Sequence, residues 1–189
     1  MTTPIFEIET ALEAVLYAAE RLKSKDFHKV FKVLYFADRE HFAKYGRPIT
    51  GDTYIKMENG PVPSKIYDIV KAIRDTGEYT YTSYYGGGYG GERRCSQMLA
   101  VRNGKFITPL RNVDERFLAQ SDVTELEASI GEYGNLSFGE LSRRSHALAW
   151  KNADKNGKMS AENILREAGK SDDYIGYVCE QINAARELC

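Results

Sequence analysis

The sequence has few of the features that mark secreted, membrane-bound or metal-binding proteins. Only three of its 189 residues are cysteines, and their odd number and wide spacing indicate neither a disulfide framework nor a zinc site. No apolar run approaches the length that spans a bilayer, and the N-terminus has neither the basic leader nor the apolar core of a signal peptide. We therefore expect a cytoplasmic protein that does not bind a membrane.

Neither sign of charge is in excess. The 26 Lys and Arg residues nearly balance 27 Asp and Glu residues, so the formal net charge is −1 and no global field attracts DNA, RNA or an anionic membrane. The glycine-rich segment at residues 86–91, GGGYGG, ends in no Gly-Lys-Ser/Thr motif and contains no dinucleotide fingerprint, so it does not indicate a phosphate site. We expect no cofactor, and nucleic acid is an unlikely partner.

Hydrophobic residues, 42% of the chain, suffice for one core, and the length predicts a single domain over residues 1–189. At both ends of the chain they recur with helical spacing. Between Ile8 and Leu22 they predict one apolar stripe on a first helix. Capping residues mark where helices begin and end: we expect starts at Asp26, Ser64, Ser121 or Asp122, Ser137 with Glu140, Ser160 and Ser171, and ends at Gly46, Gly77 and Gly169.

The middle of the chain has the alternation of β-strands. Residues 95–102 and 105–108 flank Asn103 and Gly104, a pair typical of a type I′ hairpin turn. A third strand is expected over residues 79–85, and a short strand over residues 54–57 can join it. The predicted fold class is α+β, predominantly α: a compact helical domain with a small antiparallel β-sheet.

The most specific signal lies between Tyr35 and Tyr67. It consists of YFADREH at residues 35–41, YGRPITGD at residues 45–52, Tyr54, and NGPVPS at residues 59–64, with turns fixed by proline and glycine. This arrangement resembles the Panacea domain, the SocA-like antitoxin domain of bacterial and phage toxin–antitoxin pairs. Residues 121–153 are similar to the second half of the family.

The resemblance implies a non-enzymatic antitoxin whose partner is a protein toxin encoded nearby. Such a protein neutralises the toxin by direct binding, or as an adaptor that delivers it to a cellular protease. The motif residues are expected to build a rigid scaffold, and some of them to contact the toxin: Tyr35, Asp38, Arg39, Arg47, Pro48, Thr50, Gly51, Asp52, Tyr54, Asn59, Gly60, Pro61, Pro63 and Tyr67. Tyrosines beside the glycine-rich segment, which suit a protein interface, are further candidates: Tyr84, Tyr85 and Tyr89.

Two other functions remain open from the residues alone. Asp38 and His41 lie three residues apart on the second helix, a spacing that a metal-dependent enzyme could use, although a metal site needs three or more converging ligands. Arg143 and Arg144 lie in a short capped helix, which leaves open a DNA-binding autoregulator of the same operon. The expectation for Asp38 is instead that it accepts hydrogen bonds from the backbone of the turns that follow it, with Arg39 or Arg47 as its charge partner.

Overall fold

The computed structural model describes residues 5–83 and 91–187. Its described part is predominantly helical with small antiparallel hairpins, which confirms the predicted α+β class. The helices are α1 (Ile8–Arg21), α2 (Phe27–Tyr45), α3 (Ser64–Thr76), α4 (Gln120–Tyr133), α5 (Phe138–Ser145), α6 (Leu148–Asn152), α7 (Ala161–Glu167) and α8 (Asp172–Glu187). The strands are β1 (Tyr54–Met57), β2 (Gly60–Pro63), β3 (Thr80–Ser83), β4 (Gly91–Arg94), β5 (Leu99–Arg102) and β6 (Phe106–Pro109).

Helix α1 is buried all round, and not along a single stripe as its sequence predicts. Every residue from Ala11 to Ala19 is buried, including Glu13. The helix contacts α2, α4, β6 and the 3₁₀ turn Glu115–Phe117. The alanines on its second face add little volume, so these neighbours can approach from every side. The predicted apolar stripe is buried, and the opposite face of the helix is buried as well.

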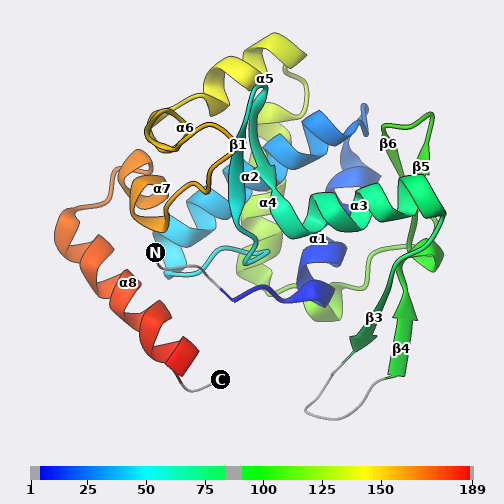
Figure 1. Ribbon diagram of the computed structural model, residues 1–189, viewed down its shortest axis with the longest axis horizontal. Coiled ribbons are helices and arrows are strands. Elements are labelled where there is room, and N and C mark those ends of the chain that lie inside the picture. The colour runs from blue at the N-terminus through cyan, green and yellow to red at the C-terminus, as the bar shows by residue number, and fades with distance from the viewer. Residues whose placement is uncertain (1–4, 84–90, 188–189) are drawn as a thin grey trace.

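Helix α2 lies at the centre of the fold. It contacts α1, α4, α5, α7 and β2, and Figure 1 shows it crossing the centre of the molecule. Its ends are as predicted. The Asp26 carboxylate accepts a hydrogen bond from Lys29 N–H at 3.1 Å, and Gly46 ends the helix with φ of 73°, a left-handed conformation that glycine adopts without steric cost.

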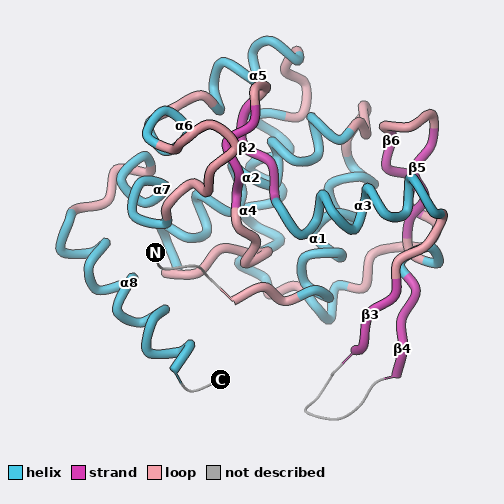
Figure 2. The backbone as a smooth tube through the Cα atoms, viewed as in Figure 1, coloured by secondary structure: helices cyan, strands magenta, loops and turns pink. Residues whose placement is uncertain are grey.

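The strands form three separate hairpins, β1–β2, β3–β4 and β5–β6, which lie apart in Figure 2. The expectation that residues 54–57 and 79–85 join one sheet was wrong. Two of the hairpins pack on helices, β2 on α2 and α5 and β5 on α3, so their hydrophobic residues are buried without extension of a sheet. The turn at Asn103 and Gly104 is as predicted, since both residues have positive φ, 49° and 68°.

The C-terminal helices form a second cluster at one side of the molecule. Leu165 of α7 and Ile175 and Val178 of α8 pack with Phe42 of α2. Helix α8 runs along this side, and the β3–β4 hairpin projects at the other (Figure 1). Ser160 caps α7 by accepting from Asn163 N–H at 3.2 Å, as predicted. None of the helices within the described ranges has the length and apolar character needed to cross a membrane.

Candidate functional site

Asp38 of α2 is the centre of a buried network formed by the motif. Its side chain is 3% exposed. One carboxylate oxygen accepts from Thr50 N–H at 2.9 Å, and the other accepts from Thr50 Oγ1 at 2.5 Å and Tyr54 Oη at 2.8 Å. The carboxylate therefore ties α2 to the loop that enters β1. Asp38 accepts from the following turn as predicted, but the predicted charge partner was wrong: Arg39 pairs with Glu40 and Glu167, and Arg47 pairs with Asp122.

Burial raises the pKa of Asp38 to about 6, although the hydrogen bonds from Thr50 and Tyr54 act in the opposite direction. The folded state thus binds a proton at Asp38 more tightly than the unfolded chain, whose aspartates have a pKa of about 4. The stability that this proton provides is fully present below about pH 4 and is lost as the pH rises through about 6.

We predict that Asp38→Asn removes this pH dependence. The free energy of unfolding of the wild type, minus that of Asp38→Asn, should fall by about 3 kcal/mol between about pH 4 and about pH 7. Urea denaturation at several pH values measures the difference. Asp114→Asn is the control of opposite sign, because a hydrogen bond from Arg116 lowers the pKa of Asp114 to about 2. A difference between wild type and Asp38→Asn that stays constant with pH would contradict the assignment.

Asp52 caps α3 from outside the helix. Its carboxylate accepts from the backbone N–H groups of Lys65 at 3.0 Å and Ile66 at 2.8 Å. The expectation that Ser64 caps this helix was wrong, because Ser64 is its first residue and the preceding Pro63 makes no side-chain cap. A carboxylate at a helix N-terminus satisfies free N–H groups and complements the helix dipole. The ITGD motif therefore supplies the start of α3.

His41, Arg47 and Asp122 join α2 to α4. His41 is fully buried, with Nδ1 2.7 Å from Arg47 O and Nε2 3.0 Å from an Asp122 carboxylate oxygen. The Arg47 guanidinium donates to the same Asp122 oxygen at 2.8 Å. Burial alone would raise the pKa of Asp122, but hydrogen bonds from His41 and Ala119 and the charge of Arg47 hold it below its ordinary value. Asp122 is therefore the anionic partner of Arg47 and accepts a hydrogen bond from His41.

A third network contains a residue that the sequence did not single out, Glu167 of α7. One oxygen accepts from Tyr35 Oη at 2.9 Å and from Arg39 at 3.2 Å, and the other accepts from Ala149 N–H at 2.8 Å. Its side chain is 5% exposed. Through these hydrogen bonds, Glu167 connects α7 and the start of α6 to two motif residues of α2. Its local signal is a glutamate in the last turn of a helix, where the helix dipole disfavours an anion.

The β1–β2 turn places the rest of the motif near the N-terminal half of α2. Pro61 O accepts from Lys32 Nζ at 2.7 Å. Gly60 has φ of 106°, a conformation that glycine adopts without steric cost. Tyr67 packs edge-on against Phe31, with ring centroids 6.0 Å apart. Asn59 is exposed, but Pro61 and Pro63 are buried.

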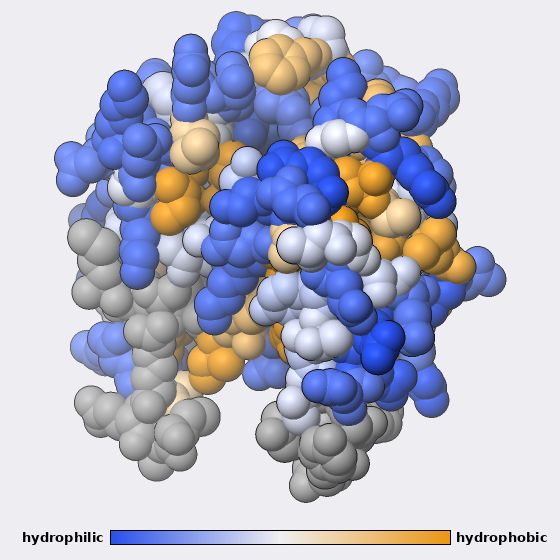
Figure 3. Space-filling model, turned by 45° about the vertical axis from the view of Figure 1, so that its right-hand side comes forward, coloured by the Kyte–Doolittle hydropathy of each residue, from blue (hydrophilic) through white to orange (hydrophobic). Residues whose placement is uncertain are grey.

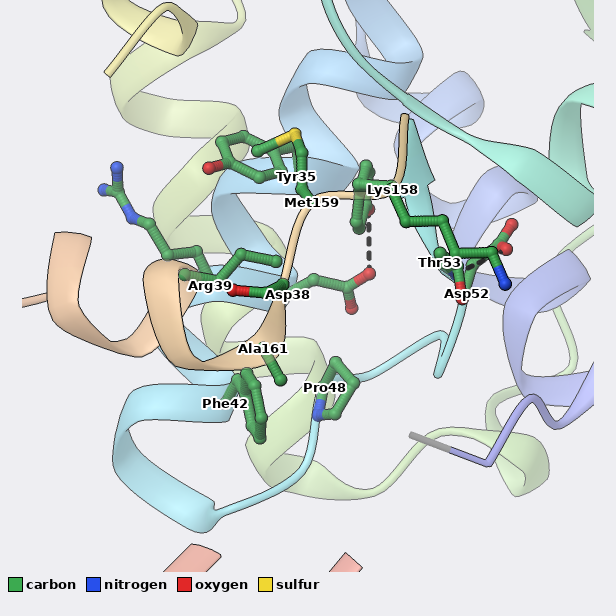
Figure 4. Close-up of a pocket in the computed structure, with 13 residues that line it drawn as sticks. Tyr35, Asp38, Arg39, Phe42, Pro48, Asp52, Thr53, Lys158, Met159 and Ala161 are labelled. Atoms are coloured by element: carbon green, nitrogen blue, oxygen red, sulfur yellow. Dashed lines mark hydrogen bonds between the residues drawn. The ribbon is translucent and has the colours of Figure 1, made fainter. Parts of the chain in front are cut away.

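The cavity beside Asp38 is too small for a substrate. Its volume is about 30 Å³, about that of one water molecule. Figure 4 shows its walls: Tyr35, Asp38, Arg39 and Phe42 of α2 face the segment from Lys158 to Ala161 that leads into α7. A drug-sized ligand or metabolite normally occupies roughly 300 Å³ or more. The motif polar groups are therefore arranged to bind one another.

The residues considered for a metal-dependent enzyme and for DNA binding have other partners in the structure. Asp38 and His41 have different partners, and among the described residues no hydrogen bond is found between them. Residues 5–83 and 91–187 contain no group of three or more His, Cys, Asp or Glu side chains placed to hold a metal ion. Arg144 pairs with Glu132 at 3.2 Å. Tyr84, Tyr85 and Tyr89 lie outside the described residues.

The sequence was compared with models of known protein families. The model of the family described as "Antitoxin SocA-like, Panacea domain" matches residues 30–151, which include the three α2 networks except Glu167. The chain belongs to this family. No curated protein and no solved structure matches the sequence. The matched residues end within α6, so Glu167 of α7 lies outside them although it contacts the motif residues Tyr35 and Arg39.

Proposed function

We propose that this Panacea-domain protein is a non-enzymatic, cytoplasmic antitoxin that neutralises a protein toxin, encoded beside it, by binding the toxin directly. The observation that carries the proposal is the family match, because it covers 122 residues that include the complete motif. The family description gives the antitoxin role, and direct binding is the mechanism that we propose for it.

The geometry of the motif favours binding over catalysis. Each motif carboxylate already accepts hydrogen bonds from the protein: Asp38 from Thr50 and Tyr54, and Asp52 from the start of α3. A general base or nucleophile needs an open position for its substrate, and the cavity beside Asp38 has room for about one water. These side chains therefore stabilise the scaffold that presents the surface.

Protein surface suited to a partner is present outside these networks. Large hydrophobic side chains are exposed on several elements, with exposed fractions of 61% for Tyr177, 54% for Phe138 and 52% for Tyr45. On the face drawn in Figure 3, hydrophobic surface lies in patches among hydrophilic side chains. Aromatic residues provide contact area at low conformational cost. We place the toxin on such patches.

We predict that co-expression of this chain restores growth to cells that the neighbouring gene product alone arrests. Growth curves under separate inducible promoters measure the effect, and immunoblotting follows the amount of the neighbouring protein. Restored growth with an unchanged toxin level is the result expected for direct binding. Restored growth with loss of the toxin, reversed in protease-deficient cells, would replace direct binding by delivery to a protease. Persistent arrest would contradict the antitoxin proposal.

A further inference from the structure

Lys32 of α2 is a buried cation without an acidic partner. Its side chain is 1% exposed, and its ammonium donates a hydrogen bond to Pro61 O at 2.7 Å. Among the ion pairs of residues 5–83 and 91–187, none includes Lys32. Buried charges are normally paired, because desolvation of an unpaired ion is costly. An ammonium has three N–H groups, so its capacity to donate is not exhausted.

Lys32 is one of the residues that line a cavity of about 300 Å³. Its lining includes Phe31 and Tyr67, and His28 stacks on Phe138 at its edge with ring centroids 3.9 Å apart. Phe138 is 54% exposed, so the aromatic wall continues to the surface. The volume is ten times that of the cavity beside Asp38 and accommodates a side chain.

Several other buried charges of the described chain have an oppositely charged partner, whereas Asp38 and Asp52 accept hydrogen bonds from neutral groups. Glu13 pairs with Arg111, Glu125 with Lys44, and Glu167 with Arg39. Burial lowers the pKa of Lys32 to about 7, so loss of the proton relieves part of the cost near neutral pH. An incoming anion would reverse this change, because an opposite charge favours the ammonium form.

We propose that Lys32 receives a carboxylate of the toxin, carried by an acidic side chain or C-terminus on an apolar segment that fills the aromatic cavity. This inference rests on the proposed function. Charge complementarity selects the occupant: Lys32 has no ion-pair partner among the described residues, and most of the lining is aromatic or aliphatic, with the exposed Glu58 and Asn59 in the β1–β2 turn. Since Lys32 is 1% exposed, binding includes rotation of its ammonium from Pro61 O into the cavity.

The titratable groups around Lys32 are His28 on the same helix, His146 after α5, Glu58 in the β1–β2 turn and Tyr67 on α3. Burial, and then the charge of Lys32, lower the pKa of His28 to about 4. The same causes, with Lys56, lower the pKa of His146. Both imidazoles are neutral near pH 8, so proton uptake on binding there reports on Lys32.

The test is calorimetric titration of the purified neighbouring protein into this chain at about pH 8, in buffers of different ionisation enthalpy. The wild type should take up about one proton on binding. Lys32→Met retains the length and the apolar stem of the side chain. Because the variant removes a buried charge and keeps the packing, we expect it to fold, and circular dichroism tests this. This variant should bind about thirtyfold more weakly and take up no proton.

Lys105→Met is the matched control, because it removes an exposed lysine from the β5–β6 turn and should leave affinity and proton uptake unchanged. Equal affinity of wild type and Lys32→Met, or proton uptake that persists in Lys32→Met, would overturn the inference while direct binding stands. If the neighbouring protein does not bind the wild type, the proposed function fails. The cavity is then judged with phenylacetate: an NMR shift of the Lys32 ε-methylene supports a carboxylate site, and its absence overturns it.

Discussion

Glu167→Ala is expected to lower the free energy of unfolding by about 3–5 kcal/mol, the loss typical when one partner of a buried ion pair is removed. The substitution leaves the hydroxyl of Tyr35 and the backbone N–H of Ala149 without their acceptor, and Arg39 without one of its two carboxylates. Tyr35 is fully buried, so water does not replace the lost acceptor without opening the contact between α2 and α7.

Chemical denaturation of purified wild type and Glu167→Ala measures this loss. Glu180→Ala on α8 is the control, since it removes an exposed glutamate and should change stability by no more than about 0.5 kcal/mol. A loss below about 1 kcal/mol for Glu167→Ala would show that α7 is held by apolar packing alone. It would also remove Glu167 from the scaffold that supports the Panacea motif.

Gly60→Val should lower the free energy of unfolding by about 2–6 kcal/mol, because two costs add. The φ of 106° strains a β-branched residue by roughly 1–3 kcal/mol. A β-carbon at this position would also lie 2.4 Å from Ser145 Oγ and 2.6 Å from Lys32 Cε. Both neighbours are buried, so they cannot turn into solvent, and overpacking adds about 1–3 kcal/mol.

Gly77→Val separates the two causes. Gly77 also has a positive φ, 81°, but a β-carbon there meets no atom within 4 Å. This variant should therefore lose about 1–3 kcal/mol from strain alone. Thermal and denaturant unfolding of both variants give the comparison. Equal losses would mean that Lys32 and Ser145 yield to the new side chain, and the contact between the β1–β2 turn and α5 would then be loose.

Features that depend on neighbours in sequence could be predicted from the sequence. The caps at Asp26 and Ser160 act within three residues, and the turn at Asn103 and Gly104 depends on the φ values of those two residues alone. Local rules of this kind are specific, because the partner lies within the same turn of the chain. They also gave the motif turns between Tyr35 and Tyr67.

The features that the sequence did not predict depend on distant partners. Tyr35 and Glu167 are 132 positions apart, and Asp52 caps a helix that begins twelve residues later. Two local misfits could have indicated such contacts: Glu167 in the last turn of α7, and Lys32 within the apolar run VFKVLYF at residues 30–36. A residue that violates a local rule is often held by tertiary structure or function. The separate hairpins were missed because strand patterns do not specify which strands pair.

The proposed antitoxin function requires that this Panacea domain and the neighbouring gene product form a complex without any third component. Size-exclusion chromatography with light scattering on the two purified proteins, mixed at micromolar concentrations in the absence of proteases and nucleic acid, tests it most directly. We predict a new species whose mass is the sum of whole numbers of both chains, and recovery of both proteins from that peak. Two separate peaks with the masses of the isolated proteins would contradict the account.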